Sequence, residues 1–159
     1  MPINPNLTAE RATFVTHLEC SMTGERYEAD QLHGLSRVGR PLLVRYDLAA
    51  VKAAIPKAMI AARPTDLWRW RELLPVRHTR DIVSLGEIET PLIAIPRSSG
   101  SPNVLVKDEG RLPTGSFKAR GLVMAVAMAK ELGVTRIAMP TNGNAGAALA
   151  AYATRCGME

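Results

Sequence analysis

The alternation of hydrophobic and polar positions changes along the chain, and the change falls near residue 75. Before it, residues 13–46 carry short apolar stretches separated by turn residues, a pattern typical of strands. The clearest is PLLVRYDL, in which β-branched and aromatic residues follow a Gly-Arg-Pro break and predict a strand over Leu42–Tyr46. Residues 1–12, by contrast, are expected to form a polar arm broken by prolines.

Two helices are predicted between these strands and residue 75. Residues 47–60 are rich in alanine and favour a helix that Pro56 interrupts. Residues 65–75 favour a second helix, with Thr65 or Asp66 as the N-cap and Pro75 at its end. At helical spacing, its apolar face would consist of Leu67, Trp70, Leu73 and Leu74.

The second half of the chain alternates apolar strands with helices. The expected elements are, in order, a short extended piece in ETPLIAIPR, a strand over 103–109, a helix over 117–132 that Ser116 can cap, a strand over 135–140, and a helix from Asn144 to about Cys156. This order predicts an α/β fold, a parallel sheet with crossover helices. Two strands alone would leave such a sheet uncovered, so the chain is expected to be incomplete.

Composition narrows the class of protein. Of 159 residues, 47% are apolar and 22% charged, which suits a globular core. The net charge is +5, but the basic residues are scattered among acids, so nucleic acid is not an expected partner. Cys20 and Cys156 form no C-x-x-C pair, which favours a reducing compartment. No signal peptide or membrane-spanning run of ~20 residues is visible, so a cytoplasmic protein is expected.

Two glycine-bearing stretches, PTGSFKARG at 113–121 and PTNGNAG at 140–146, each fall between a predicted strand and a predicted helix. Ligands of open α/β sheets bind at that edge, and the N–H groups of helix N-termini attract anions. Glycine permits close backbone approach and positive φ there. On local physics alone, each stretch is either a ligand cradle or merely a tight connection.

Lys118 stands just inside the helix after the first stretch, between apolar Phe117 and Ala119. A charged lysine is disfavoured near a helix N-terminus, and partial burial would further favour its neutral amine. A neutral amine can bond an aldehyde or act as a general base. The alternative is an ordinary solvated lysine of a helix.

The segments KDEGRLPTGSFKARG and PTNGNAGAALAAYA resemble the lysine motif and the asparagine loop of fold-type II pyridoxal 5'-phosphate (PLP) enzymes. The resemblance implies the parallel α/β fold of that family, which is like the β subunit of tryptophan synthase. It also implies the site residues. Lys118 would bond the cofactor PLP, Asn144 would hydrogen-bond its ring hydroxyl, and Phe117 would flank the ring. The substrate carboxylate would be bound by Thr141, Asn142, Gly143 and Ala145.

Upstream segments resemble the threonine synthase branch of this family: CSMTGERYEAD, GRPLLVRYDL, LWRWRELLPV and SLGEIETPLI. The resemblance covers about residues 18–159 and implies a lyase of threonine biosynthesis that converts O-phospho-L-homoserine and water to L-threonine and phosphate. A threonine or serine dehydratase, a cysteate synthase and a truncated non-catalytic module stay open as alternatives. Whether the protein forms a homo-oligomer also stays open.

The resemblance further implies an organisation in two parts. Residues 1–75 would be an N-terminal segment with a degenerate ribbon-like part over about 18–46, and residues 76–159 the first part of the catalytic domain. The ribbon of related enzymes holds zinc on several cysteines. Here only Cys20 is present, and His17 and His33 fit no ligand spacing, so no metal is expected. The family's glycine-rich cup for the cofactor phosphate, and its residue facing the ring nitrogen, follow the asparagine loop and are not expected within these residues.

Two basic residues near the predicted ligand edge have two interpretations. Lys107 and Arg120 could assist a substrate phosphate, or they could belong to a structural ion pair. The ion pair is the favoured reading, because charged residues beside helices are most often paired or solvated.

Overall fold

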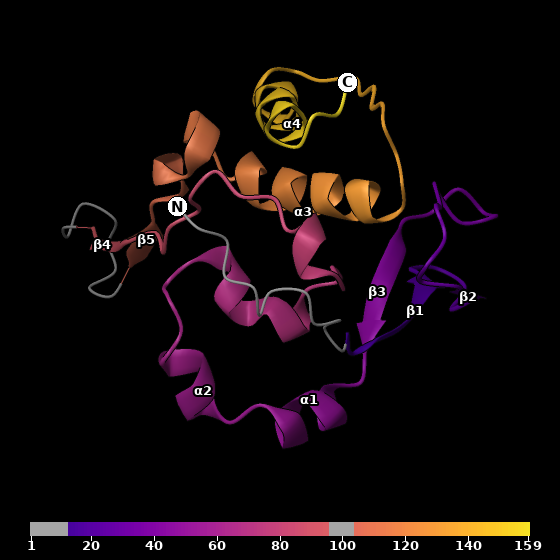
Figure 1. Ribbon diagram of the computed structural model, residues 1–159, viewed down its shortest axis with the longest axis horizontal. Helices are drawn as coiled ribbons and strands as arrows, with labels where there is room; N and C mark the ends of the chain where they lie inside the picture. Colours follow the sequence, from indigo (N-terminus) through magenta and orange to yellow (C-terminus); the bar gives the residue numbers. More distant parts are fainter. Residues whose placement is uncertain (1–12, 96–103) are drawn as a thin grey trace.

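The computed structural model describes residues 13–95 and 104–159; the expected arm at 1–12 lies outside them. At one end of the molecule lies a three-stranded antiparallel sheet of β1 (Val15–Cys20), β2 (Arg26–Tyr27) and β3 (Leu42–Tyr46), with β1 in the centre (Figure 1). In the register, Leu18 of β1 stands opposite Tyr27 and Val44. The predicted strand over Leu42–Tyr46 is confirmed with its bounds.

The alanine-rich segment forms two short helices, α1 (Leu48–Ala54) and α2 (Lys57–Ala61), as predicted from the proline between them. The side chain of Asp47 caps α1, because its Oδ1 accepts the N–H of Ala50 at 2.8 Å. Pro56 occupies the N-cap of α2, where its missing N–H costs no helical hydrogen bond.

The tryptophan-bearing segment is a 3-10 helix, η2 (Leu67–Leu73), rather than an α-helix, and the predicted apolar face was wrong. Asp66 does cap it, accepting the N–H of Arg69 at 3.0 Å. However, Trp68 is the buried indole, at 9% exposure, while Trp70 is 44% exposed. A 3-10 helix has about 3.0 residues per turn, and the backbone departs from helical angles at Trp70, so 3.6-residue spacing misplaces the side chains. A second short 3-10 helix, η3 (Thr79–Asp81), follows.

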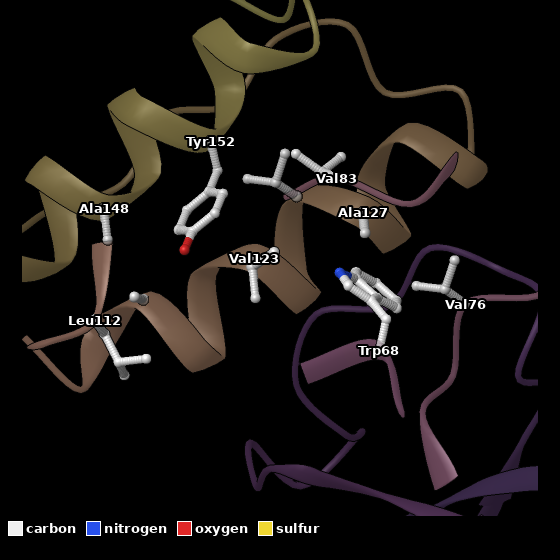
Figure 2. Packing of buried hydrophobic residues seen from close by; sticks show 10 residues of the cluster. Trp68, Val76, Val83, Leu112, Val123, Ala127, Ala148 and Tyr152 are labelled. Carbon is white, nitrogen blue, oxygen red and sulfur yellow. The ribbon is translucent and has the colours of Figure 1, made fainter. Parts of the chain in front are cut away.

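Two longer helices form the other half of the molecule and pack against each other (Figure 1). They are α3 (Lys118–Glu131) and α4 (Asn144–Arg155), which confirm the helices predicted there to within about two residues at each end. The core lies between them and the segment before α3 (Figure 2). It is built from Trp68, Val76, Val83, Leu112, Ala119, Val123, Val126, Ala127, Ala148 and Tyr152.

The predicted parallel sheet is not confirmed by the described residues. The strand expected over 103–109 is the shorter β5 (Leu105–Lys107), and it pairs antiparallel with β4 (Leu92–Ala94). Residues 135–140 form no strand, because a strand needs a hydrogen-bonding neighbour along its length. Glu159 is the neighbour present: its carbonyl accepts the N–H of Ile137 at 2.7 Å, and its N–H donates to Thr135 at 3.0 Å. Such a two-bond pattern is that of parallel pairing.

Short 3-10 turns lead from β5 into α3. They are η5 (Glu109–Arg111) and η6 (Pro113–Gly115), and η6 contacts both α3 and α4. Among the helices of the described ranges, none has the length and apolar character needed to cross a bilayer. The fold as described is a small α/β arrangement with short sheets, in which the two main helices begin close to each other.

Candidate functional site

The two glycine-bearing stretches meet at one cavity of about 470 Å³. Lys118, the first residue of α3, lines it from one side, and residues 140–145 line it from the other. The structure therefore brings together residues that are 26 positions apart, 144 − 118, in the sequence. Its volume lies within the range of about 300–1,000 Å³ that is usual for small-molecule sites.

A sharp backbone turn before α3 places Lys118 at this cavity. Thr114 and Gly115 have φ of 66° and 69°, and the positive φ at Thr114 is uncommon for a residue other than glycine. The predicted cap at Ser116 is realised in modified form: Phe117 is the N-cap by position, while Ser116 Oγ accepts the N–H of Lys118 at 3.3 Å. Ser116 is 8% exposed, so its hydroxyl fixes this turn from inside.

The Lys118 side chain is exposed, so the condition of partial burial considered from the sequence is not met. Its Nζ lies 4.7 Å from the centre of the Phe117 ring, which is itself 61% exposed. Ammonium groups within about 6 Å of an aromatic centre are attracted to the ring face. The amine and the aromatic ring are thus neighbours, although Phe117 itself does not line the cavity.

The asparagine loop is shaped by Thr141. Its Oγ1 accepts the N–H of Gly143 at 3.0 Å and the N–H of Gly146 at 2.8 Å. Gly143 has φ of 132°, a conformation that side chains disfavour. A Cβ added to Gly146 would come within 2.5 Å of Thr141 Cγ2. Glycine is therefore favoured at position 143 by the backbone conformation and at position 146 by the lack of space for a side chain.

These hydrogen bonds decide which donors the loop offers. The N–H groups in the first turn of an α-helix have no partner within the helix. In α4, the N–H of Gly146 is bound by Thr141, which leaves those of Asn144 and Ala145 at the cavity. Together with the dipole of a twelve-residue helix, they make a suitable place for a carboxylate.

Arg120 and Lys107 belong to a structural ion-pair network, which confirms the favoured reading of these residues. Arg120 donates from Nε and Nη2 to the two carboxylate oxygens of Glu109, with Nη2 to Oε1 at 2.9 Å. Lys107 Nζ lies 3.8 Å from Glu109 Oε1. The hydrogen bond from Arg120 is the main reason that the pKa of Glu109 falls to about 2. Neither cation lines the cavity of Lys118.

The buried carboxylate of Glu87 is hydrogen-bonded to Tyr152 of α4, and this contact was not predicted from the sequence. Glu87 is 1% exposed and accepts three hydrogen bonds, from the hydroxyl of Tyr152 at 2.7 Å, the hydroxyl of Ser84 at 2.6 Å and the N–H of Leu85 at 2.9 Å. Burial, and then the contact with Glu87, raises the pKa of Tyr152. A glutamate inside SLGEIETPLI gave no sign of burial, because its partner Tyr152 is 65 residues away.

The last residue of β1, Cys20, makes hydrogen-bonded contacts. Cys20 is 1% exposed, and its Sγ lies 3.2 Å from Ser36 Oγ and 3.5 Å from the N–H of Thr23. The contact with Ser36, and then that with Thr23, lowers the pKa of Cys20 to about 7. His33 is engaged elsewhere, 2.8 Å from the carbonyl of Glu28. Within 13–95 and 104–159, no three residues of metal-binding type gather in one place.

Comparison with known proteins agrees with this geometry. Residues 83–159 match the family described as pyridoxal-phosphate dependent enzyme. The chain is 37% identical over 143 residues to a threonine synthase of Methanocaldococcus jannaschii, covering 88% of this chain and 35% of that protein. It is 48% identical over 95 residues to a threonine synthase of Halalkalibacterium halodurans (58% and 27%), and 40% identical over 116 residues to one of Synechocystis (66% and 30%).

Residues 83–159 are therefore similar to the pyridoxal-phosphate dependent enzymes, and the resemblance inferred from the two motifs is confirmed. More narrowly, the chain is similar to threonine synthases along most of its length, and it spans about a third of the length of the relatives that it matches. The described residues fit the cofactor of this family. A primary amine and a loop at a helix N-terminus line one cavity, and an aromatic ring lies next to the amine, which suits a cofactor that carries an aldehyde, a ring and an anionic group.

Proposed function

We propose that this chain is part of a threonine synthase, a lyase that converts O-phospho-L-homoserine and water to L-threonine and phosphate. The observation that supports it most is the shared cavity of Lys118 and the asparagine loop, in a chain similar to threonine synthases on both sides of residue 75. We further propose the division into residues 1–75 and 76–159, a parallel sheet in the complete protein, and a place in the cytoplasm.

The residues of the chain would divide the work as follows. When bound, pyridoxal phosphate supplies an aldehyde for amines and a conjugated ring that accepts electron density from the α-carbon of the substrate. Lys118 would hold the cofactor through its amine. As a free amine, Lys118 would also move protons at the α- and β-carbons of the substrate. Phe117 would flank the ring, and Asn144 would hydrogen-bond the ring hydroxyl.

The loop would fix the substrate. The N–H groups of Asn144 and Ala145 at the start of α4 would bind the α-carboxylate, together with Asn142 of the same loop. The N–H of Gly143 is already donated to Thr141 Oγ1, so Gly143, expected from the sequence to bind the carboxylate, would shape the loop instead. The Thr141 hydroxyl already accepts two loop N–H groups, so its share would be chiefly to hold the loop in shape. Release of phosphate from the γ-carbon and addition of water at the β-carbon then balance the reaction.

A product assay on the full-length protein loaded with PLP tests this proposal. We expect threonine and phosphate in equal amounts from O-phosphohomoserine. Formation of 2-oxobutanoate when threonine alone is supplied would indicate a dehydratase instead, and formation of cysteate when O-phosphoserine and sulfite are supplied would indicate a cysteate synthase. A protein that bound no PLP would be the non-catalytic module, for which the exposure of the Lys118 side chain is the supporting observation. Any of these three results would contradict the proposal.

A further inference from the structure

An ion pair beside the candidate site links the helix that carries Lys118 to the segment before it. Arg120 lies two residues after Lys118, in the first turn of α3. Its guanidinium donates to both carboxylate oxygens of Glu109, in η5. The two side chains are only 31% and 20% exposed, so water competes little for this contact.

Two further residues hold the pair in place. Thr90 is 3% exposed; its hydroxyl donates to Glu109 and accepts from Arg120 Nη2 at 3.3 Å. Lys107 Nζ, at the end of β5, donates to the backbone carbonyl of Thr90 at 3.1 Å. The network therefore joins four segments: the loop before β4, which contains Thr90, the end of β5, η5 and the start of α3.

We infer that the Glu109–Arg120 pair is a positioning device for Lys118, an inference that rests on the proposed function. A guanidinium fork matches a carboxylate in one plane, so the pair fixes the rotation of the first turn of α3 as well as its distance from η5. With about 3.6 residues per turn, Lys118 and Arg120 point roughly 200° apart around the helix axis. Any rotation that released Arg120 would therefore swing Lys118 away from the asparagine loop.

The test measures how fast PLP bonds to Lys118 in the full-length protein. Borohydride traps the bonded cofactor, and mass spectrometry of the peptide gives the labelled fraction over time. We expect Arg120→Met to slow labelling of Lys118 and to lower kcat by about 10²-fold, the usual effect of displacing a reactive group by about 1 Å. Arg120→Lys keeps the charge but loses the fork, so it should fall between Arg120→Met and the unmodified protein.

A matched control lies nearby. Arg111 donates to Asp108 at 2.9 Å, but it is 61% exposed and does not contact α3 through this bond, so Arg111→Met should change both readouts by less than about twofold. Labelling at the unmodified rate in both Arg120 variants would overturn the inference. If Arg120→Met does not fold, Arg120→Lys decides alone: slower labelling supports the inference and an unchanged rate overturns it. No label on Lys118 in the unmodified protein would contradict the proposed function itself, and this inference with it.

Discussion

The hydroxyl of Tyr152 lies 2.7 Å from Oε1 of Glu87, and both side chains are almost fully buried. The contact joins α4 to the loop before β4, and Figure 2 shows the Tyr152 ring reaching from α4 toward α3. A buried carboxylate is costly unless donors surround it, and Glu87 has three donors. The position of α4, and with it that of the asparagine loop, therefore depends on the hydrogen bonds to Glu87.

Tyr152→Phe should lower the free energy of unfolding by about 1–3 kcal/mol, because it removes one of the three donors to the buried carboxylate of Glu87 while keeping the ring. Urea denaturation checks the value. Tyr46→Phe is the control, since Tyr46 is only partly buried and its hydroxyl makes no hydrogen bond within the described ranges. Equal losses in the two variants would show that the contact with Glu87 adds nothing.

The second prediction concerns the glycine that Thr141 overlies. Gly146→Ala should cost about 1–3 kcal/mol, since its Cβ would overlap Thr141 and force the loop to move. Gly121→Ala near the start of α3 is the matched control: a Cβ there meets nothing within 4 Å, so alanine should stabilise the helix by up to about 1 kcal/mol. Thermal unfolding of both variants gives the comparison, and a stabilised Gly146→Ala protein would refute the steric reason.

The two tryptophans should differ strongly. Trp68→Ala removes a core residue and should cost about 3–5 kcal/mol. Trp70→Ala removes a side chain that is 44% exposed and should cost much less. Denaturant unfolding measures both, and the quenching of their fluorescence by iodide should be stronger for Trp70. If Trp70→Ala cost more stability than Trp68→Ala, the apolar face expected from the sequence, with Trp70 in the core, would be correct instead.

The Glu109–Arg120 pair predicts an acid-dependent loss of stability. The Arg120 hydrogen bond lowers the pKa of Glu109 to about 2, against roughly 4.3 for an unperturbed glutamate. A carboxyl with a lowered pKa stabilises the fold above its unfolded value and loses that contribution as the pH falls toward about 2. The difference in unfolding free energy between the unmodified protein and Glu109→Gln should shrink over that interval. A difference that does not change with pH would show that the ion pair contributes nothing.

Elements set by local chemistry could be predicted from the sequence, and elements set by distant partners could not. The strand over Leu42–Tyr46, the break at Pro56 and the helix starting near Lys118 depend on their own residues, and all are confirmed. The pairing of β4 with β5 and the burial of Glu87 depend on segments far along the chain, so no local pattern reveals them. Periodicity also failed for Trp68, because it assumes an α-helix.

The candidate site shows the same division. The motifs indicated that Lys118 and Asn144 belong together, and both line one cavity. The supporting hydrogen bonds, from Thr141 to two glycines and from Arg120 to Glu109, were not predictable, since they depend on the exact folding of each turn.

The most direct measurement identifies the lysine that bonds pyridoxal phosphate. The full-length protein is incubated with the cofactor, reduced with borohydride, digested and mapped by mass spectrometry. The account predicts one dominant label, on Lys118, and its loss in Lys118→Ala but not in Lys130→Ala, a lysine at the far end of the same helix. A label distributed over several lysines, or one that persists in Lys118→Ala, would contradict the account.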